Sequence, residues 1–244
     1  FIREDFIKGI EEAHAMGKKV HAVLNIIPHV RRVAAFEKVV DEMAQLKPDA
    51  FIMADPGLID IVRNRYPDIP IHLSVQANTV NAGSVKFWQK VGLTRCILAR
   101  ELSLTEIDMI KQECPDMEIE VFAHGALCIA VSGRCLISGL LSHRDANIGA
   151  CNNSCRYGFN IRNVHAATAD DVTTFEADDG TTLSAQIEES MHHPGEWMTM
   201  EEDLNGSYLM NSKDLCTLPV LKKLIEIGVD SLKIEGRSRS PFYS

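Results

Sequence analysis

Short apolar runs alternate with longer amphipathic segments along this chain. The runs recur about every 24 residues and are apolar at nearly every position, which is typical of parallel strands covered by helices. Between the runs, apolar residues recur at three- and four-residue spacing, which predicts helices. The expected strands cover residues 19–25, 50–55, 71–78, 95–100, 119–125, 207–212 and 231–237, and the expected helices cover residues 31–46, 57–66, 82–91, 104–113 and 214–227.

An amphipathic helix is also expected at the start of the chain, since Phe6, Ile7 and Ile10 begin an apolar stripe. No Gly-rich phosphate-binding fingerprint follows any strand, so the repetition favours a TIM-type barrel over an open doubly wound sheet. The long interval after the fifth strand predicts an insertion. We therefore predict an α/β fold, a TIM-like (β/α) barrel, with βα units in residues 1–125, a cysteine-bearing insertion and polar loop region in 126–206, and the last barrel elements in 207–244.

Composition narrows the class of protein. Hydrophobic residues make up 45% and charged residues 24% of the 244 positions, which is ordinary for a globular chain and argues against disorder. The net charge of −9 gives no general attraction to nucleic acid, so a nucleic-acid role needs a local basic patch. The most apolar stretch, 125–141, carries Arg134, and no export leader is visible, so we expect a cytoplasmic protein with no membrane partner.

Four of the seven cysteines fall close together in the insertion. They are separated by six, fifteen and three residues, which is looser than the paired spacing of a zinc ribbon. Iron–sulfur clusters accept more varied loop spacings. From spacing alone, an iron–sulfur site, a zinc site and unligated core cysteines all remain open. The clustered residues are Cys128, Cys135, Cys151 and Cys155.

Polar side chains stand near the ends of most expected strands, where a βα barrel places its active face. One of them, Asp55, precedes Pro-Gly, which favours a helix cap over a functional role. The others converge on a single face if the strands are parallel. The complete set is Asn25, Asp55, Gln76, Arg100, His124, Lys233 and Glu235.

One longer motif connects a strand to the cysteines. It reads Glu120-Val-Phe-Ala-His124-Gly-Ala-Leu-Cys128, then six residues, then Cys135-Leu-Ile-Ser138. This run resembles the signature of the collagenase-like peptidase family of unassigned catalytic type. Further segments resemble the branch of that family whose members hydroxylate tRNA. They are HLSVQANTVN at 72–81, ILARELSL at 97–104, HPGEWM at 193–198, MNSKDLC at 210–216 and SLKIEGR at 231–237.

The resemblance implies a function as well as a fold. It implies a TIM-like barrel whose opening strands, and a smaller C-terminal domain, are not part of this sequence. It also implies formation of 5-hydroxyuridine at the tRNA wobble position, with prephenate as co-substrate and a 4Fe–4S cluster. Relatives act instead on ribosomal RNA or on a quinone precursor. The implied cluster ligands are Cys128, Cys135, Cys151 and Cys155, with Cys216 in reserve for the fourth position.

Candidate catalytic residues come from the strand ends and the motif. A histidine can move protons near neutral pH, but His124 can equally well hydrogen-bond its loop. Alternation places Glu120 on the same side of its strand as His124, where it can instead pair with a cation. The candidate catalytic set is His124, Glu120, Lys233 and Glu235.

Candidate substrate-binding residues are mainly arginines, because a dicarboxylate such as prephenate, and tRNA phosphate, need fixed cations. Any of these arginines can instead pair with an acidic neighbour such as Glu101, Glu235 or Asp145. The set, in order of preference, is Arg237, Arg134, Arg100, Arg156, Gln76 and Asn25.

Two other classes of function stay open. A peptidase is what the family label suggests, but the sequence contains neither H-E-x-x-H nor G-x-S-x-G. A non-catalytic scaffold with a structural metal does not explain the polar strand ends. The resemblance therefore favours the tRNA hydroxylase.

Overall fold

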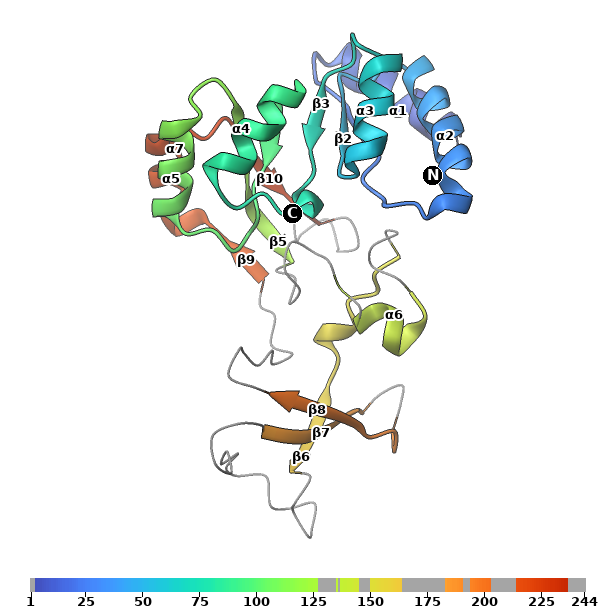
Figure 1. The fold of residues 1–244 in the computed structure, drawn as a ribbon, viewed down its shortest axis with the longest axis vertical. Coiled ribbons are helices and arrows are strands. Elements are labelled where there is room, and N and C mark those ends of the chain that lie inside the picture. The colour runs from blue at the N-terminus through green and yellow to red at the C-terminus, as the bar shows by residue number, and fades with distance from the viewer. Residues whose placement is uncertain are drawn as a thin grey trace.

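The structure is a computed structural model that describes residues 3–126, 135, 137–144, 150–163, 183–190, 194–202 and 214–236. These residues form a large sheet with helices on its outer face and a small antiparallel sheet at one end of it (Figure 1). The small sheet and a short helix lie beyond the carboxyl ends of the large sheet's strands (Figure 1).

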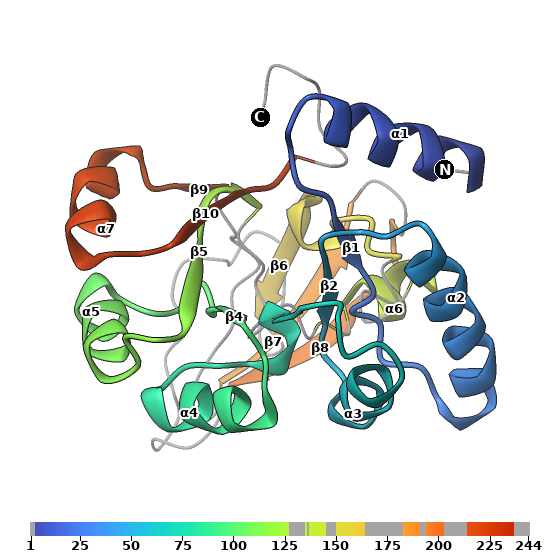
Figure 2. The ribbon, with the colours of Figure 1, turned by 90° about the horizontal axis from the view of Figure 1, so that it is seen from above.

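The strands of the large sheet are parallel, apart from one short strand. Its order is β1 (His21–Val23), β2 (Ala50–Met53), β3 (Ile71–Leu73), β4 (Arg95–Ile97), β5 (Glu118–Ala126) and β10 (Ser231–Ile234), and β9 (Asp214–Cys216) pairs antiparallel with the end of β5. Seen from above, these strands form an arc with the helices outside it (Figure 2). The predicted run of parallel βα units is confirmed. In the described part of the chain the sheet is an open, curled half-barrel.

Local capping explains where several helices begin. The Asp55 carboxylate accepts a hydrogen bond from the Leu58 amide at 3.0 Å, so this strand-end residue is a helix cap. Asn81 caps the next helix, and Ser103 with Glu106 forms a capping box. The helices are α1 (Arg3–Ala15), α2 (Val33–Gln45), α3 (Pro56–Arg65), α4 (Ala82–Val91), α5 (Leu104–Glu113) and α7 (Leu221–Ile227), with 3₁₀ turns η1 (Val30–Arg32), η2 (Val75–Ala77) and η6 (Leu218–Val220).

The main core lies between the outer face of the sheet and the helices. Alternate strand residues, among them Phe51, Leu73 and Ile119, are fully buried there. The inner, concave face has a much smaller apolar cluster of Ile52, Ile97 and Phe122. The rest of the concave face is therefore available to polar side chains.

The insertion forms a small unit in its described parts. It contains α6 (Ile137–Ser142), a 3₁₀ turn η5 (Ser154–Arg156) and an antiparallel sheet of β6 (Phe159–Asn163), β7 (Leu183–Glu189) and β8 (Met198–Glu202). Arg156 Nη2 lies 2.6 Å from Asp214 Oδ1, and this ion pair joins the insertion to the large sheet.

The structure corrects the predicted start of the last helix. Residues 214–216 form β9 instead of a helical turn, and the Thr217 amide and hydroxyl both donate to the Ala123 carbonyl, at 2.9 and 3.0 Å. The helix begins only at Leu221. The amphipathic stripe of α1 also buries less than expected, because only Ile10 is buried and Phe6 is 42% exposed. The predicted strand at 207–212 lies outside the described residues.

Candidate functional site

Arg100, Glu235 and Phe122 meet at the carboxyl ends of β4, β5 and β10. Arg100 Nη2 pairs with Glu235 Oε2, and the guanidinium carbon lies 3.5 Å from the centre of the Phe122 ring. The Arg100 side chain is only 10% exposed. The charge of Arg100 is thus held in place by one carboxylate and one aromatic face. The sequence left open whether Arg100 binds an anionic substrate or pairs with an acidic residue of the protein. In the structure it pairs with Glu235.

Glu120 is the centre of an ion-pair network deeper on the concave face. Its carboxylate lies 3.1 Å from Arg95 Nη1 and 3.7 Å from Lys233 Nζ, and it accepts a hydrogen bond from Ser231 Oγ at 3.0 Å. The Glu120 side chain is 7% exposed, so these donors stabilise a charge that is nearly removed from water. The network links β4, β5 and β10. It also brings two candidate catalytic residues, Glu120 and Lys233, into contact.

His124 lies at the end of β5, opposite Cys216 in the antiparallel register with β9. Its Nδ1 donates to the Leu215 carbonyl oxygen at 3.1 Å. Because a carbonyl oxygen can only accept, the proton in this bond is on Nδ1. The hydrogen bond fixes the orientation of the ring at the strand end.

Gly125, which follows His124, has a φ of +141°. A Cβ at this position would lie 2.7 Å from the Cβ of Glu235. Glycine therefore allows the end of β10 to approach β5 closely. This close approach places Glu235 next to Arg100.

Asn25 and Gln76 belong to a second group at the same end of the sheet. The Asn25 side-chain amide donates to Ser74 Oγ at 3.1 Å, and the Gln76 backbone amide lies 3.4 Å from the same oxygen. Ser74 is almost completely buried. The structure thus brings these two candidate binding residues together around one hydroxyl.

Two histidines on the concave face were missed by the sequence reasoning. The rings of His21 and His72 meet edge to face with their centres 4.6 Å apart, and His72 is 5% exposed. Burial, reinforced by Arg95, lowers the pKa of His72 to about 3, and burial followed by Arg95 also lowers the pKa of His21. Strand alternation could have predicted the position of His72, because His72 shares a face with Ser74.

The described cysteines of the insertion lie around α6 and η5. Cys135 is buried, Cys155 is half-buried and Cys151 is exposed, and these residues are thiols, not disulfides. Cys151 Sγ accepts a hydrogen bond from the Asn153 amide at 3.3 Å. Within the described ranges, no three His, Cys, Asp or Glu side chains are arranged to hold a metal ion. Cys128, Arg134 and Arg237 lie outside the described residues.

The remaining candidate arginine, Arg156, is in the cysteine loop, residues 150–157, which carries Cys151 and Cys155. Its ion pair with Asp214 again shows an arginine that pairs with an acidic side chain, although not with one of the neighbours expected from the sequence. The sequence did not indicate Asp214 as the partner, because residue 214 was expected to begin a helix and not to lie in a strand beside Arg156. Arg156 therefore anchors the loop to β9.

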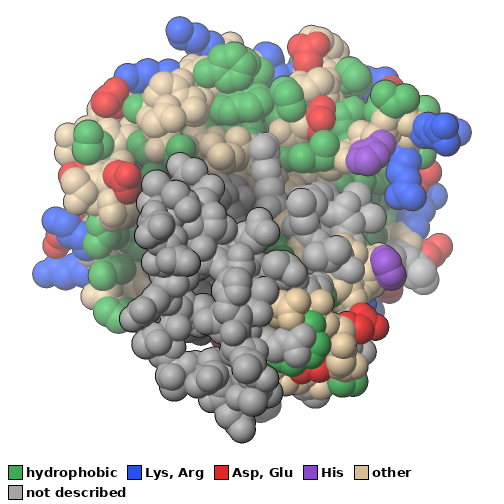
Figure 3. Space-filling model, turned by 60° about the horizontal axis from the view of Figure 1, so that its bottom comes forward, with side chains coloured by type: hydrophobic (Ala, Val, Ile, Leu, Met, Phe, Trp, Pro, Cys, Tyr) green, Lys and Arg blue, Asp and Glu red, His purple; other side chains and the backbone are tan. Residues whose placement is uncertain are grey.

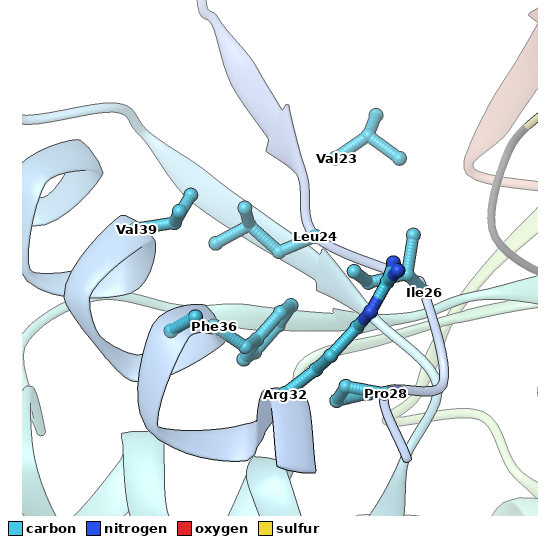
Figure 4. A pocket seen from close by; sticks show the side chains of 8 residues that line it. Val23, Leu24, Ile26, Pro28, Arg32, Phe36 and Val39 are labelled. Atoms are coloured by element: carbon cyan, nitrogen blue, oxygen red, sulfur yellow. The ribbon is translucent and has the colours of Figure 1, made fainter.

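An apolar pocket of about 520 Å³ lies between β1 and α2. Leu24, Phe36 and Val39 line it, and the Arg32 side chain lies along one wall (Figure 4). Apart from Arg32, the lining offers no group suited to proton transfer or ion pairing. The polar groups at the strand ends therefore form the better candidate site.

Among the described residues, the face seen in Figure 3 shows no concentration of Lys and Arg suited to a polyanion. In Figure 3, the coloured Lys and Arg side chains are spread around the outline of the view and are mixed with acidic ones. No helix in the described ranges has the length and apolarity that a bilayer crossing requires.

The whole chain, residues 1–244, matches the model of Peptidase family U32, and the protein belongs to this family. This match agrees with the family resemblance seen in the motif around Glu120 and His124. The family description refers to peptidases, whereas the similar curated proteins are named for tRNA hydroxylation.

The chain is 49% identical over 256 residues to tRNA hydroxylation protein P of Escherichia coli (strain K12), covering 100% of this chain and 56% of that protein. It is 46% identical over 253 residues to tRNA hydroxylation protein P of Haemophilus influenzae (strain ATCC 51907 / DSM 11121 / KW20 / Rd), covering 96% and 54%. The chain therefore spans about half the length of these curated relatives. A solved structure, titled "The Structure of the U32 Peptidase Mk0906", is similar with a TM-score of 0.45 and 16% identity, over 51% of this chain and 53% of that one.

Proposed function

We propose that the full-length protein is a tRNA-modifying hydroxylase that forms 5-hydroxyuridine at the wobble position and uses prephenate as co-substrate. The observation that carries the proposal is the 49% identity, across the entire chain, to a protein named for tRNA hydroxylation. A tRNA substrate also implies a cytoplasmic location. The concave face supports an enzyme, because fixed charges and oriented polar groups gather at the carboxyl ends of parallel strands.

We further propose that the arc of strands belongs to a TIM-like barrel. Five of its strands follow each other in chain order, and β10 adds a sixth parallel strand beside β5. Helices cover the outer face, as in such barrels (Figure 2). The polar groups at the strand ends would then face into the mouth of the barrel.

The proposed resident cofactor is a 4Fe–4S cluster held by Cys128, Cys135, Cys151 and Cys155, with Cys216 as the alternative fourth ligand. The donor chemistry of the described residues fits, since Cys135, Cys151, Cys155 and Cys216 are thiols and the Asn153 amide already donates to the Cys151 sulfur. In the described structure Cys135, Cys151 and Cys155 are not arranged to hold a metal ion, so the proposal requires these three cysteines to come together, with Cys128, when the cluster binds. When bound, such a cluster supplies an electron-transfer or Lewis-acid centre.

For prephenate and tRNA phosphate we propose arginine contacts. Arg100 and Arg156 already pair with carboxylates, so an incoming anion must compete with Glu235 or Asp214 for them. Arg237 remains the first candidate and Arg134 the second. Asn25 and Gln76 supply polar groups at the same strand ends, and Glu235, His124 and the Glu120–Lys233 pair remain the proposed proton-handling residues.

The test is mass spectrometry of tRNA nucleosides from cells with and without the full-length protein. We expect 5-hydroxyuridine to disappear on deletion and to return with the wild-type gene. If the tRNA nucleosides are unchanged while a ribosomal RNA nucleoside is lost, the tRNA assignment is wrong. If no nucleoside changes and the purified protein cleaves a gelatin substrate, the peptidase hypothesis replaces the hydroxylase.

The arginine assignment has its own test. In full-length protein, Arg237→Ala should move the prephenate concentration needed for wobble hydroxylation upward by at least about tenfold, because one bidentate pair is lost. An unchanged titration curve at unchanged iron content would show that Arg237 does not bind prephenate.

A further inference from the structure

The segment that follows β1 forms an exposed basic turn at the rim of the candidate site. We call residues 28–32, which include η1, the β1 turn. It begins three residues after Asn25, whose side chain bonds to Ser74 at the carboxyl ends of the strands. The β1 turn therefore lies on the side of the sheet that carries the polar strand ends. Its exposed side chains are those of His29, Val30, Arg31 and Arg32.

The β1 turn offers two positive charges that the described part of the chain does not neutralise by pairing. Within the described ranges, neither the Arg31 nor the Arg32 guanidinium takes part in a hydrogen bond or an ion pair. The first turn of α2, which follows directly, carries no acidic side chain. Arg100 and Arg156 differ in this respect, because each is already paired with a carboxylate. Arg31 and Arg32 are therefore available to bind an anion from outside the protein.

The apolar pocket between β1 and α2 adjoins this turn. Pro28 and Arg32 belong to the turn and also line the pocket, together with Leu24 and Phe36 (Figure 4). The volume of about 520 Å³ is within the range of sites that hold small ligands. Among the described residues that line it, Arg32 supplies the only charge. A ligand that fits therefore has an apolar or aromatic ring with a negative group beside it.

A nucleotide combines these two features. Unstacked bases of RNA bind apolar surfaces and the flat faces of arginine side chains, and phosphates pair with guanidinium groups. Val30 and Arg31 stand next to the pocket but are not part of its lining, and Val30 is 90% exposed. The surface thus continues beyond the pocket, which suits a polymer better than a small free anion.

Charge alone cannot hold RNA at this place. The net charge of the chain is −9, and two arginines neutralise only about two phosphates. The spread of Lys and Arg side chains in Figure 3 likewise offers no large basic face. The apolar pocket must therefore supply part of the binding free energy, so the contact is local and depends on both features.

We propose that the β1 turn and the adjoining pocket bind one unstacked nucleotide of the tRNA substrate, with its base in the pocket and the neighbouring phosphates on Arg31 and Arg32. The inference rests on the proposed function and adds a substrate-binding surface to it. Because the turn lies on the same side as the strand ends, this contact holds the RNA beside the proposed catalytic groups. It contributes to the binding of tRNA and not to that of prephenate.

The charge of the β1 turn is tested by a double substitution. Arg31→Gln/Arg32→Gln removes both positive groups and keeps long polar side chains. Lys18→Gln/Lys19→Gln is the matched control, because it removes the same charge from exposed residues at the opposite end of β1. A general loss of attraction for RNA would affect both double variants equally.

The pocket is tested by filling it. Ala35→Leu adds volume at an exposed position of α2 that lines the pocket. Ala34→Leu is the matched control, since Ala34 is the preceding exposed residue of the same helix and does not line the pocket. Leucine and alanine are both strong helix formers, so α2 should be unaffected in either variant. Thermal melting of each variant checks the fold.

The experiment uses full-length protein and an unmodified tRNA transcript with uridine at the wobble position. Fluorescence anisotropy gives the dissociation constant at several salt concentrations, and the hydroxylation assay gives the KM values for tRNA and for prephenate. Arg31→Gln/Arg32→Gln should weaken tRNA binding by about 10–30-fold at about 0.1 M salt and make the plot of log K against log salt less steep by about 1.4. Ala35→Leu should weaken tRNA binding at least about fivefold with an unchanged slope. Both should raise the KM for tRNA and leave that for prephenate unchanged, and the two control variants should match the wild type.

The outcomes are distinguishable. Wild-type protein that neither binds nor hydroxylates tRNA overturns the proposed function and this inference with it. If the wild type does both and the arginine double variant keeps its affinity and salt slope, only the inference is wrong. An equal loss in the lysine control also overturns it, because the effect is then one of overall charge.

The pocket has its own decisive result. If Ala35→Leu leaves tRNA binding unchanged, the assignment of a nucleotide to the pocket is wrong. A raised KM for prephenate would then identify a co-substrate pocket, and a lower melting temperature would identify a packing surface within the full-length protein.

Discussion

Acidification should destabilise this protein through His72. Its imidazole is buried on the concave face, near Arg95, His21, Lys19 and Lys233, and its pKa falls from 6.5 to about 3. The folded pKa is therefore lower than the unfolded one. The stability that depends on neutral His72 is complete above pH 6.5 and is lost as the pH falls from 6.5 toward 3.

The size of the effect follows from the two pKa values. At pH 5 the unfolded imidazole is mostly protonated while the folded one is neutral, which favours unfolding by about 2 kcal/mol relative to pH 8. Below pH 3 the loss reaches a ceiling of about 5 kcal/mol. His21 adds to the loss in the same direction, because its pKa is also lowered by burial.

The assay is urea unfolding of full-length wild-type and His72→Leu protein at pH 8 and pH 5. The variant cannot protonate at this position, so its loss of stability between the two pH values should be smaller than that of the wild type by about 2 kcal/mol. His29→Gln, which removes an exposed histidine, is the control. Equal pH dependence in wild type and His72→Leu would show that His72 is not buried as described.

Three further changes test the concave face and the cysteine loop. Glu120→Ala should destabilise the fold by about 3–5 kcal/mol in urea unfolding, because Arg95 loses a buried partner; a change below about 1 kcal/mol would contradict the buried network. Gly125→Ala should cost about 1–3 kcal/mol in the same assay, since it combines a positive φ with a clash against Glu235, and wild-type stability would rule out this close approach. Cys151→Ser should lower the iron content of anaerobically reconstituted protein, and unchanged iron would remove this residue from the ligand set.

The sequence by itself determined the order and kind of most elements. The predicted bounds of the helices at 82–91 and 104–113 agree with the structure, because their ends carry local signals such as the Asn81 cap and the Ser103–Glu106 box. Alternation along β5 also predicted that Glu120 and His124 share a face. These features depend on neighbours a few residues away, and such neighbours are visible in the sequence.

Only the tertiary structure decided which polar side chains meet. Arg100 pairs with Glu235 across 135 positions, and Glu120 bonds to Ser231 across 111 positions. The strand at 214–216 exists because the end of β5 offers it backbone partners, which outweighs the helical pattern read from its own residues. Pairing across a sheet depends on strand order and register, and these emerge only when the arc assembles, so a linear pattern could name the candidates but not join them.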